Sequence, residues 1–502
     1  MAKKILFFID LWFFHFGIAK FIQEKSDYEL FSIIEVEDKA KKFFNTQKIV
    51  NFKKIWQYTD NVLFQNEEVD INYLKNFENR YRIDLWKIAY SERVFYQYNR
   101  FHRFNDKEIL KIIELEAKFF EKVLDEINPD FLSLMAPTSH HTRLLYEICR
   151  SRGIKCLVFS FVRFANRVMI SEDNNSLGEE KINPENLPKS NKSFEDLQIF
   201  LKEHDASKKI DEVKEVGFES HFWERYKAII KFFISTRTPS FKNHFPNFGK
   251  TRYKYFIIKI SNFFKKKSRQ RFIDKNLTKE IDLSQSYVYF PLHFEPEQVL
   301  LMGNAQYYSD QFTIISNIAR SLPVDYRLFV KEHPGMKIEG WREKNYYKRI
   351  MELPNVILIN PSVSSEKIIK NCSLVITVGG TTGQEAAFYN KPAIIFTEQI
   401  YSILPSVYQL KSLEELPEAI RKSLKRRINP SEVEEYIRLI IKNTFDLNLE
   451  YTSADFAYRF GLKGLIMDAE LPEIEVKKLL KDYQTMFEKL AHEHIKKIEI
   501  KK

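Results

Sequence analysis

Two short segments between residues 330 and 396 carry side chains and glycines suited to holding a phosphate group. One contains Lys331, Glu332 and His333 and directly follows the apolar run 326–330. The other, Gly-Gly-Thr-Thr-Gly at 379–383, follows the apolar run 373–378. Such apolar runs predict buried parallel strands, and ligands of open α/β sheets bind where these strands end. We therefore expect the two segments to contribute to one ligand site.

The glycine-rich segment 379–383 is expected to open a helix. Unpaired N–H groups and the helix dipole attract anions to a helix N-terminus, and glycines let the backbone approach a ligand and adopt positive φ. A tight strand–helix turn with an N-cap threonine is the alternative interpretation of the same five residues. The segment matches neither GxGxxG nor the P-loop Gly-Lys-Thr, which disfavours dinucleotide oxidoreductases and ordinary NTPases.

Further motifs surround these two segments. Region 288–396 also contains Tyr-Phe-Pro-Leu-His-Phe-Glu-Pro-Glu at 289–297, Asp-Gln at 310–311, Pro-Asn-Val at 354–356 and Asn-Pro-Ser at 360–362. Together the motifs resemble the capsule polysaccharide biosynthesis family, glycosyltransferases of the two-Rossmann-domain GT-B type that include bacterial β-Kdo transferases of capsule and lipopolysaccharide. The resemblance is looser in the amino-terminal third.

The resemblance implies that the second Rossmann-like domain binds a nucleotide-sugar donor, with no further cofactor. CMP-Kdo or a related CMP-linked sugar is the favoured donor, because the His-Pro element is shared with bacterial enzymes that use CMP-activated acidic sugars. GT-B enzymes generally stabilise the leaving phosphate with helix dipoles and basic side chains, without a metal ion. The residues expected to bind the nucleotide are Lys331, His333, Pro334, Ser362, Gly380, Thr381, Thr382, Gly383 and Glu385.

The expected catalytic residues depart from the family pattern. Kdo transferases of this family carry an aspartate on the loop after the first strand of the second domain, where this chain has His-Phe-Glu-Pro-Glu at 293–297. Glu295 or Glu297 would serve there as nucleophile, base or acceptor contact. His333 would assist departure of the phosphate, and Asp10, at a strand end, is a candidate for activating the acceptor hydroxyl.

Alternating strand and helix patterns predict an α/β fold with two Rossmann-like domains facing a cleft. The expected divisions are an acceptor-side domain at 1–171, a linker and basic helical insertion at 172–285, a nucleotide-sugar-binding domain at 286–419 and C-terminal helices at 420–502. Strands are predicted at 4–9, 131–135, 155–159, 287–290, 326–330, 356–359, 374–378 and 393–396. Helices are predicted at 11–23, 106–127 and 142–152.

A pair of histidines follows the predicted strand 131–135. His140 and His141 are candidates for contacting an acceptor sugar, and His141 is a second candidate for activating its hydroxyl. Neighbouring residues in a helix or strand point in different directions, so we expect the pair not to chelate one metal ion. A helix cap or another structural role is the remaining alternative.

The positive charge of the chain is concentrated in one segment. Residues 225–275 contain fifteen Lys or Arg against one acidic residue, Asp274, whereas the net charge of the whole chain is +11. Aromatic residues are interleaved with these cations, as in helices that bind anionic membrane surfaces. The alternatives are a helical insertion whose aromatics pack on the domain, or nucleic-acid binding, which no RRM, KH or zinc-finger signature supports.

Composition places the protein among folded chains of a reducing compartment. The 502 residues are 44% hydrophobic, enough for two or three domains. Cys149, Cys156 and Cys372 are odd in number and lack zinc spacing. No run of 18 apolar residues occurs, and Asp10 interrupts the apolar N-terminal run. We expect a cytoplasmic protein, peripheral at the inner membrane face if segment 225–275 binds lipid.

Two other functions remain open at this stage. A UDP-sugar 2-epimerase uses the same double-Rossmann scaffold and a comparable glycine-rich turn, and fold does not determine function. A non-catalytic capsule assembly protein would bind nucleotide or glycan without turnover. The partners expected in every case are a nucleotide-sugar and a glycan or glycolipid, and no nucleic acid.

Overall fold

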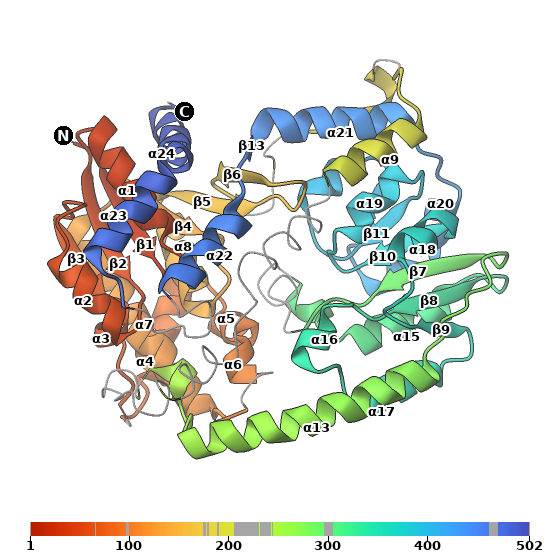
Figure 1. Ribbon diagram of the computed structural model, residues 1–502, viewed down its shortest axis with the longest axis horizontal. Coiled ribbons are helices and arrows are strands. Elements are labelled where there is room, and N and C mark those ends of the chain that lie inside the picture. The colour runs from red at the N-terminus through yellow and green to blue at the C-terminus, as the bar shows by residue number, and fades with distance from the viewer. Residues whose placement is uncertain are drawn as a thin grey trace. The chain divides into compact units, whose positions relative to one another are not determined.

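The chain divides into two compact units. The computed structural model describes residues 2–65, 67–96, 100–173, 177, 180–187, 190–204, 230, 242, 244–295, 305–460 and 470–500. Unit 1 comprises Met1–Asn174, Asp205–Arg252 and Thr444–Lys502, and unit 2 comprises Asn175–His204 and Tyr253–Asn443. Each unit has its own sheet and its own hydrophobic core (Figure 1).

Unit 1 contains a seven-stranded sheet of Rossmann-like order. Its strands run β13-β6-β5-β4-β1-β2-β3. Strands β1 to β5 are parallel, and β6 pairs antiparallel with both β5 and β13. The strand order reverses between β1 and β4, which gives a topological switch point there. The strands are β1 (Lys4–Ile9), β2 (Glu29–Ile34), β3 (Lys54–Gln57), β4 (Phe131–Met135), β5 (Lys155–Phe161), β6 (Arg167–Ser171) and β13 (Phe445–Asp446).

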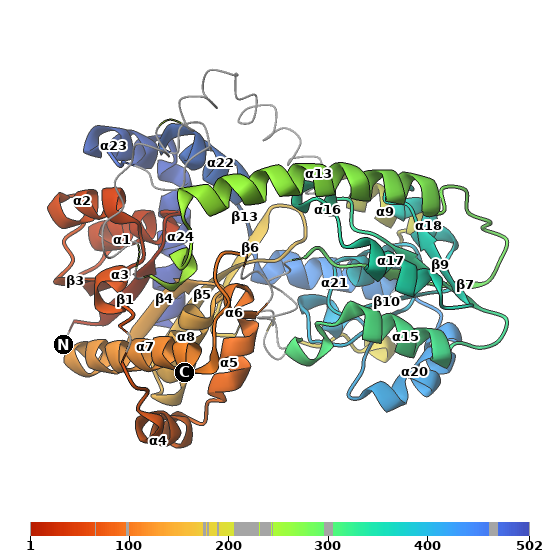
Figure 2. The ribbon, with the colours of Figure 1, turned by 90° about the horizontal axis from the view of Figure 1, so that it is seen from below.

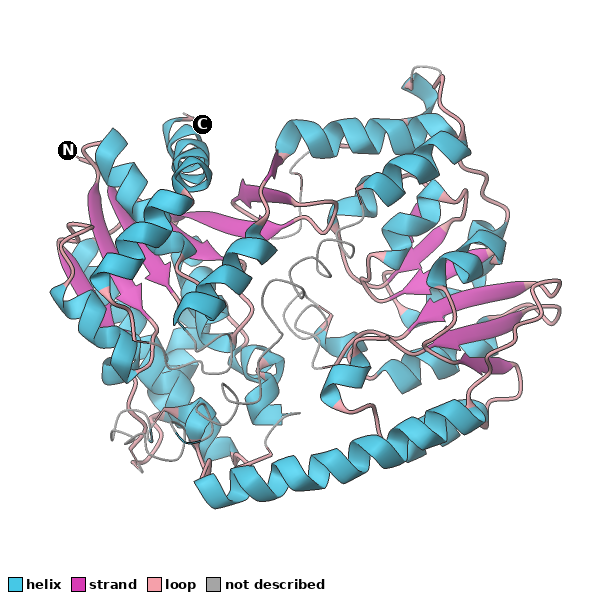
Figure 3. Ribbon diagram, viewed as in Figure 1, coloured by secondary structure: helices cyan, strands magenta, loops and turns pink. Residues whose placement is uncertain are grey.

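Helices cover both faces of this sheet (Figure 3). One face packs against α1 (Phe14–Lys25), α2 (Asp38–Thr46), α22 (Leu449–Phe460), α23 (Glu473–Asp482) and α24 (Gln484–Glu499). The other packs against α4 (Ile71–Tyr81), α5 (Leu85–Ser91), α7 (Asp106–Ile127) and α8 (His140–Ser151). Three short elements complete the unit, namely α3 (Tyr58–Asn61), α6 (Arg93–Tyr96) and the 3-10 turn Phe245–Asn247.

Unit 2 contains a six-stranded parallel sheet. Its order is β12-β11-β10-β7-β8-β9, with the switch point between β7 and β10. The apolar strands are buried on both faces, as parallel strands between two helical layers must be. The strands are β7 (Tyr287–Pro291), β8 (Arg327–Lys331), β9 (Val356–Ile359), β10 (Leu374–Thr377), β11 (Ala393–Ile395) and β12 (Val407–Gln409).

Two helical layers also enclose the sheet of unit 2. One layer consists of α15 (Gln311–Ser321), α17 (Lys344–Met351), α20 (Leu416–Leu424) and the C-terminal half of α13 (Arg252–Asn276). The other consists of α18 (Ser365–Asn371) and α19 (Thr382–Phe388), with α9 (Phe194–Glu203) and α21 (Pro430–Asn443) packed beyond α19. The short elements are α16 (Met336–Glu339) and the 3-10 turns Pro184–Asn186, Gln306–Tyr308, Ile400–Ile403 and Leu413–Glu415.

The two Rossmann-like sheets confirm the predicted fold class. All eight predicted strands are present within two residues of their expected ends, and helix 106–127 has the predicted bounds because Asn105 and Glu108 form a capping box at its start. The sequence prediction omitted β2, β3, β6, β12 and β13. No helix of the described residues is long and apolar enough to cross a membrane.

The compact units differ from the predicted divisions. Within segment 172–285, α9 and most of α13 group with unit 2, whereas the 3-10 turn Phe245–Asn247 groups with unit 1; residues 205–229 and 231–241 lie outside the described residues. The C-terminal helices are also divided: α20 and α21 complete unit 2, whereas α22, α23 and α24 pack in unit 1. Unit 1 is therefore assembled from three separate stretches of the chain.

Gly17 makes the contact between α1 and α24 possible. A Cβ atom at Gly17 would lie 2.2–2.6 Å from ring atoms of Phe487, which is buried and stacks on Phe21 at 6.3 Å between ring centroids. We predict that Gly17→Ala destabilises the protein by about 1–3 kcal/mol through overpacking, measured by urea unfolding. Phe487→Leu should recover part of that loss in the double variant. Equal stability of Gly17→Ala and wild type would contradict the predicted packing.

Candidate functional site

The switch point of unit 2 brings the ends of β7 and β10 into hydrogen-bonding contact. The ring Nε2 of His293, after β7, lies 3.1 Å from the hydroxyl of Thr377, the last residue of β10. Thr377 Oγ1 also accepts a hydrogen bond from the backbone N–H of Gly380 at 3.0 Å. The side chain of Gln311 accepts from the backbone N–H of His293 at 2.7 Å. These bonds fix the strand-end loops on which a ligand site at this position would be built.

The glycine-rich turn has a different physical basis from the one expected. Gly379, Gly380 and Gly383 do not adopt positive φ. Instead, a Cβ at Gly379 would lie 2.7 Å from the Gln399 amide nitrogen, and one at Gly380 would lie 2.9 Å from Thr377 Oγ1. Glycine is therefore required in this turn because neighbouring side chains leave no room for a Cβ atom.

The two threonines of the turn do not cap α19 with their side chains. Thr381 is the N-cap residue, with helical backbone angles and no side-chain cap hydrogen bond. Its hydroxyl donates instead to Glu385 Oε1 at 3.1 Å. Tyr401 donates its hydroxyl hydrogen to the Gly380 carbonyl at 2.6 Å, which holds the turn from outside. Thr382 begins the helix and is half-buried.

Lys331 ends β8 on the same face of the sheet as α18 and α19. Its buried amine donates to the hydroxyl of Ser365 at 2.6 Å. Burial lowers the pKa of Lys331 to about 8, although the negative charge of Glu385 opposes this decrease. A phosphate bound beside this amine would favour its charged form. Lys331 and Glu385, both expected at the nucleotide, are thus electrostatically coupled.

Glu332 points to the opposite face and is fully buried. It accepts hydrogen bonds from Arg342 Nε at 2.9 Å and from the hydroxyl of Tyr347 at 2.7 Å. Burial raises the pKa of Glu332, and the charge of Arg342 opposes the rise. A second carboxylate, that of Glu295, lies 2.5 Å from Arg342 Nη1. Arg342 also donates to the carbonyl of His293, so one guanidinium joins the loops after β7 and β8.

His333 is the exposed side chain of the loop after β8. Its Nδ1 accepts a hydrogen bond from the Gly335 N–H at 3.1 Å, so the neutral ring carries its proton on Nε2. Partial burial and the positive charges of Lys331 and Arg342 lower the pKa of His333. Phe294 packs edge-on against the ring, with 5.8 Å between centroids. A neutral Nε2–H group can donate a hydrogen bond to a phosphate.

The remaining nucleotide-side and catalytic candidates occupy separate positions. Pro334 is exposed next to His333. Ser362 is exposed after β9, and its hydroxyl donates to Asn360 Oδ1 at 2.8 Å in a local turn. Glu295 interacts with Arg342 as described above, whereas Glu297 lies outside the described residues. The sequence prediction did not include Arg342, Thr377 or Gln311, although Gln311 was part of the motif 310–311.

Unit 1 has a pocket at its own switch point. A cavity of 350 Å³ opens at the ends of β1, β2 and β4. Its polar wall is formed by Asp10, Glu35, Glu37, Thr59, Thr138, Ser139, His141, Thr142 and His244. Phe8, Trp12 and Leu134 contribute to its apolar wall. The pocket combines carboxylates, hydroxyls and an imidazole, which are the groups that hydrogen-bond a sugar.

Asp10 and Glu35 form a pair of carboxylates in this pocket. Burial and the nearby charge of Glu35 raise the pKa of Asp10 to about 7, although the N–H of Trp12 donates to Asp10 Oδ1 at 3.0 Å. Burial also acts to raise the pKa of Glu35, but His141 outweighs this effect and keeps it below the ordinary value. Two carboxyl groups with opposite shifts can serve as acid and base near neutral pH. The sequence prediction included Asp10 but not Glu35.

The two histidines have different surroundings. His141 lines the pocket, and its Nε2 lies 3.0 Å from Glu35 and 3.1 Å from the hydroxyl of Ser139. His140 is fully buried behind it, with Nδ1 2.9 Å from Glu92 and Nε2 2.9 Å from Glu116. Burial lowers the pKa of His140, but the two carboxylates outweigh it and raise the pKa to about 10.

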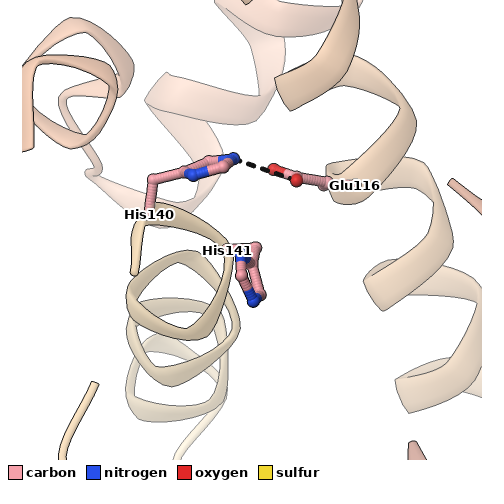
Figure 4. A group of neighbouring side chains, drawn as sticks. All are labelled: Glu116, His140 and His141. Atoms are coloured by element: carbon pink, nitrogen blue, oxygen red, sulfur yellow. Dashed lines mark hydrogen bonds and ion pairs between the residues drawn. The ribbon is translucent and has the colours of Figure 1, made fainter. Parts of the chain in front are cut away.

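The two rings contact different carboxylates, yet both lie close to Glu116. One ligand atom from each of Glu116, His140 and His141 lies within 4.8 Å of the others. Figure 4 shows the two rings at the start of α8, with Glu116 reaching His140 from α7. The residues occupy the first turn of the helix, where the rings lie 5.3 Å apart at 85°. No sequence motif marked Glu92 or Glu116, which lie 48 and 24 residues before His140.

The described fold and sites define an α/β protein of two Rossmann-like domains with polar groups at both switch points. A family model described as capsule polysaccharide biosynthesis protein matches residues 185–445, just over half of the chain. The chain therefore belongs to the capsule polysaccharide biosynthesis protein family. A search of curated proteins found no match.

The solved structures that match this chain have low sequence identity to it and low TM-scores. UDP-GlcNAc 2-epimerase from Methanocaldococcus jannaschii, in complex with UDP-GlcNAc and UDP, is 12% identical, with a TM-score of 0.26, over 88% of this chain and 100% of that one. The Neisseria meningitidis enzyme bound to UDP-GlcNAc is 12% identical, with a TM-score of 0.26, over 88% and 99%. The spinosyn rhamnosyltransferase SpnG is 10% identical, with a TM-score of 0.24, over 87% and 95%. Similarity at this level carries no information on function.

The raised pKa of Asp10 predicts a pH dependence of stability. Between about pH 4 and pH 7 the folded state binds more protons than the unfolded state, so stability falls as pH rises through that window. The shift corresponds to about 4 kcal/mol at most, and partial exposure reduces it to about 1–2 kcal/mol. We predict that Asp10→Asn removes this decrease, measured by urea unfolding at pH 5 and pH 8. Asp27→Asn, at an exposed position, should lose stability between pH 5 and pH 8 as wild type does. If Asp10→Asn loses the same stability over this range as wild type, the raised pKa of Asp10 is contradicted.

Proposed function

We propose that the protein is a glycosyltransferase of capsule biosynthesis that uses a nucleotide-sugar donor. Membership of the capsule polysaccharide biosynthesis protein family carries this proposal. The arrangement in unit 2 supports it, because basic and hydrogen-bonding groups converge at the carboxyl ends of β7, β8 and β10. Rossmann-like sheets bind nucleotides at this position.

In unit 2, the proposed donor phosphates contact the glycine-rich turn and His333. The Lys331 amine, whose pKa is about 8, supplies positive charge. A bound phosphate would raise this pKa and so increase the protonated fraction of the amine. His333 donates its Nε2–H to a phosphate oxygen and stabilises the leaving nucleotide. Arg342 acts as a positioning residue, because it holds Glu295 and Glu332 and the loops that carry them. The proposed donor is CMP-linked, with Kdo or a related acidic sugar.

In unit 1, the proposed acceptor is a glycan or glycolipid that enters the 350 Å³ pocket. Asp10 and Glu35 are proposed to bind and activate its hydroxyl group, since a carboxyl group with a pKa of about 7 accepts and releases protons near neutral pH. His141 orients Glu35 through the 3.0 Å contact between them. Glu295 and Glu297 remain the proposed catalytic residues on the donor side.

A nucleotide screen tests the donor. We predict that CMP, but not UDP, GDP or dTDP, raises the melting temperature, by about 5 °C or more at one hundred times its Kd. His333→Gln should weaken CMP binding, because it removes the imidazole donor, while Lys337→Ala at an exposed neighbouring site should not. Stabilisation by UDP and not by CMP would exclude the Kdo-like donor while leaving a UDP-sugar transferase or epimerase.

A turnover assay with and without a glycan acceptor separates the remaining functions. A transferase consumes the donor only when a glycan acceptor is present, whereas a 2-epimerase converts the sugar nucleotide alone. Replacing Glu295 and Glu297 together with alanine should abolish capsule formation if they are catalytic. Because Glu295 contacts Arg342, the folding of this variant must be checked by its melting temperature. Capsule formation that survives in a folded variant would favour the non-catalytic alternative.

Helix α13 supports the proposal that the protein works at an anionic membrane surface. Tyr253, Phe256, Ile257, Ile260, Phe263 and Phe264 are exposed and recur at helical spacing along one face. The exposed lysines Lys254, Lys259 and Lys267 lie on or beside this face by their helical positions. Exposed aromatics flanked by lysines suit the interface of a bilayer with negative headgroups. The C-terminal half of α13 is anchored elsewhere, through Arg269 and Gln270 to Trp341 at 2.8 Å each.

Vesicle flotation tests the membrane proposal. We predict that the protein floats with phosphatidylglycerol-containing vesicles and not with neutral phosphatidylcholine vesicles. Replacing Lys254, Lys259 and Lys267 with alanine should weaken binding about 100-fold, because each lysine near an anionic surface contributes about 1 kcal/mol. Replacing the exposed Lys477, Lys478 and Lys481 of α23 is the matched control. Failure to bind either vesicle would contradict the proposal without affecting the donor assay.

A further inference from the structure

A buried group of three side chains lies beneath the pocket of unit 1. Glu116 comes from α7, and His140 and His141 come from the first turn of α8 (Figures 2 and 4). One ligand atom of each lies within 4.8 Å of the other two. All three side chains are at least nine-tenths buried, with exposed fractions of 0%, 0% and 4%.

Each imidazole of this group is held from outside by a separate carboxylate. His140 Nδ1 lies 2.9 Å from Glu92 Oε2, and His141 Nε2 lies 3.0 Å from Glu35 Oε2. These contacts leave His140 Nε2 and His141 Nδ1 as the remaining ring nitrogens. Histidines that ligate metals usually donate their other ring N–H to a carboxylate or carbonyl, which fixes the tautomer and orientation of the ring. Both rings of this pair have that second partner.

Polar atoms of the group are buried without partners. His141 Nδ1 and Glu116 Oε2 have no hydrogen-bond partner among the residues that the structure describes. The same holds for Nε2 of His244, a buried ring that lines the same pocket as His141. Leaving a buried polar atom unpaired costs about 1–3 kcal/mol, so three such atoms in one region point to a ligand that would pair them.

The charges of the group favour a cation. Glu35, Glu92 and Glu116 supply three carboxyl groups around the two imidazoles, and Tyr58 donates its hydroxyl hydrogen to Glu116 at 2.5 Å. A dication bound here would lie against these carboxyl groups and would use the two unpaired atoms of the group, His141 Nδ1 and Glu116 Oε2.

We propose that Glu116, His140 and His141 bind a divalent transition metal ion of the zinc class. Two imidazoles and one carboxylate form an established zinc ligand set. Ligand atoms of a tetrahedral zinc site lie about 3.3–3.5 Å apart, so binding shortens the longer separations within the group and lengthens the 2.9 Å contact between His140 and Glu116. The proton between His140 and Glu116 is released to solvent as the metal binds.

The metal would act through structure rather than in the transfer reaction. It would fasten α7 to α8 and fix the ring of His141, whose Nε2 contacts Glu35 in the pocket wall. Loss of the metal would therefore loosen the acceptor side and leave unit 2 unchanged. This inference does not depend on the donor or on the proposed reaction.

Metal titration of the whole protein tests the proposal. Protein stripped with EDTA should take up one equivalent of Zn²⁺, with a rise in melting temperature that EDTA reverses. Glu116→Gln and His141→Asn should bind Zn²⁺ at least tenfold more weakly, and Glu92→Gln 10- to 100-fold more weakly through loss of its bond to His140. The matched control is His102→Asn, which removes a partly exposed histidine paired with Glu108 at 3.0 Å and should leave binding unchanged.

Cobalt spectroscopy keeps the proposal testable if these variants do not fold. Wild-type protein titrated with Co²⁺ should develop the strong visible absorption of a tetrahedral site, and Zn²⁺ should abolish it by competition. A spectrum of hexaaqua Co²⁺ only, together with no effect of Zn²⁺ or EDTA on melting, would overturn the proposal. Equal loss of binding in His102→Asn would also overturn it, because uptake would then belong to surface histidines.

Discussion

Parallel strand pairing is the constraint on which both units depend. Because each crossover helix returns the chain to the same edge, the loops after β7, β8 and β10 must meet at one end of the unit 2 sheet, and those after β1, β2 and β4 at one end of the unit 1 sheet. Residues far apart in sequence, such as His293 and Thr377, are thereby brought within 3.1 Å. The chemistry of each site follows from which side chains occupy these few strand-end positions.

Buried charge is handled differently in the two units. In unit 2, one guanidinium, that of Arg342, holds the carboxylates of Glu332 and Glu295, so a single cation stabilises two strand-end loops. Removing one partner of such a buried pair is strongly destabilising, which makes this network rigid. In unit 1, carboxyl groups outnumber their cationic partners, and His140 lies between two of them. The buried carboxylates of the unit 2 site therefore share one guanidinium, whereas those beneath the unit 1 pocket face imidazoles.

The sequence predicted the central strands because their apolar runs are long and are followed by glycine or polar turns. It did not predict β2, β3, β6, β12 and β13, which are short or lie toward the sheet edges and bury fewer apolar residues in a row. Among the candidate residues, strand-end positions such as Asp10 and Lys331 could be inferred from local pattern. Arg342 and Glu116 could not, because they reach their partners from helices or loops whose placement depends on tertiary packing. The role of Gly380 was also hidden, since its Cβ would collide with a side chain from a strand end.

The division of unit 1 among three stretches of the chain determines the order in which the protein is completed on the ribosome. The sheet of unit 2 and the helices around it are supplied by a segment that ends at Asn443. Unit 1 begins earlier in the sequence, but its apolar face around α1 is covered by α22, α23 and α24. These helices lie in Thr444–Lys502, so the face stays uncovered until that segment has emerged. During synthesis the nascent chain therefore carries a finished second unit beside a first unit whose aromatic face, including Phe13 and Phe21, is still uncovered. The earliest translated domain is the last to close.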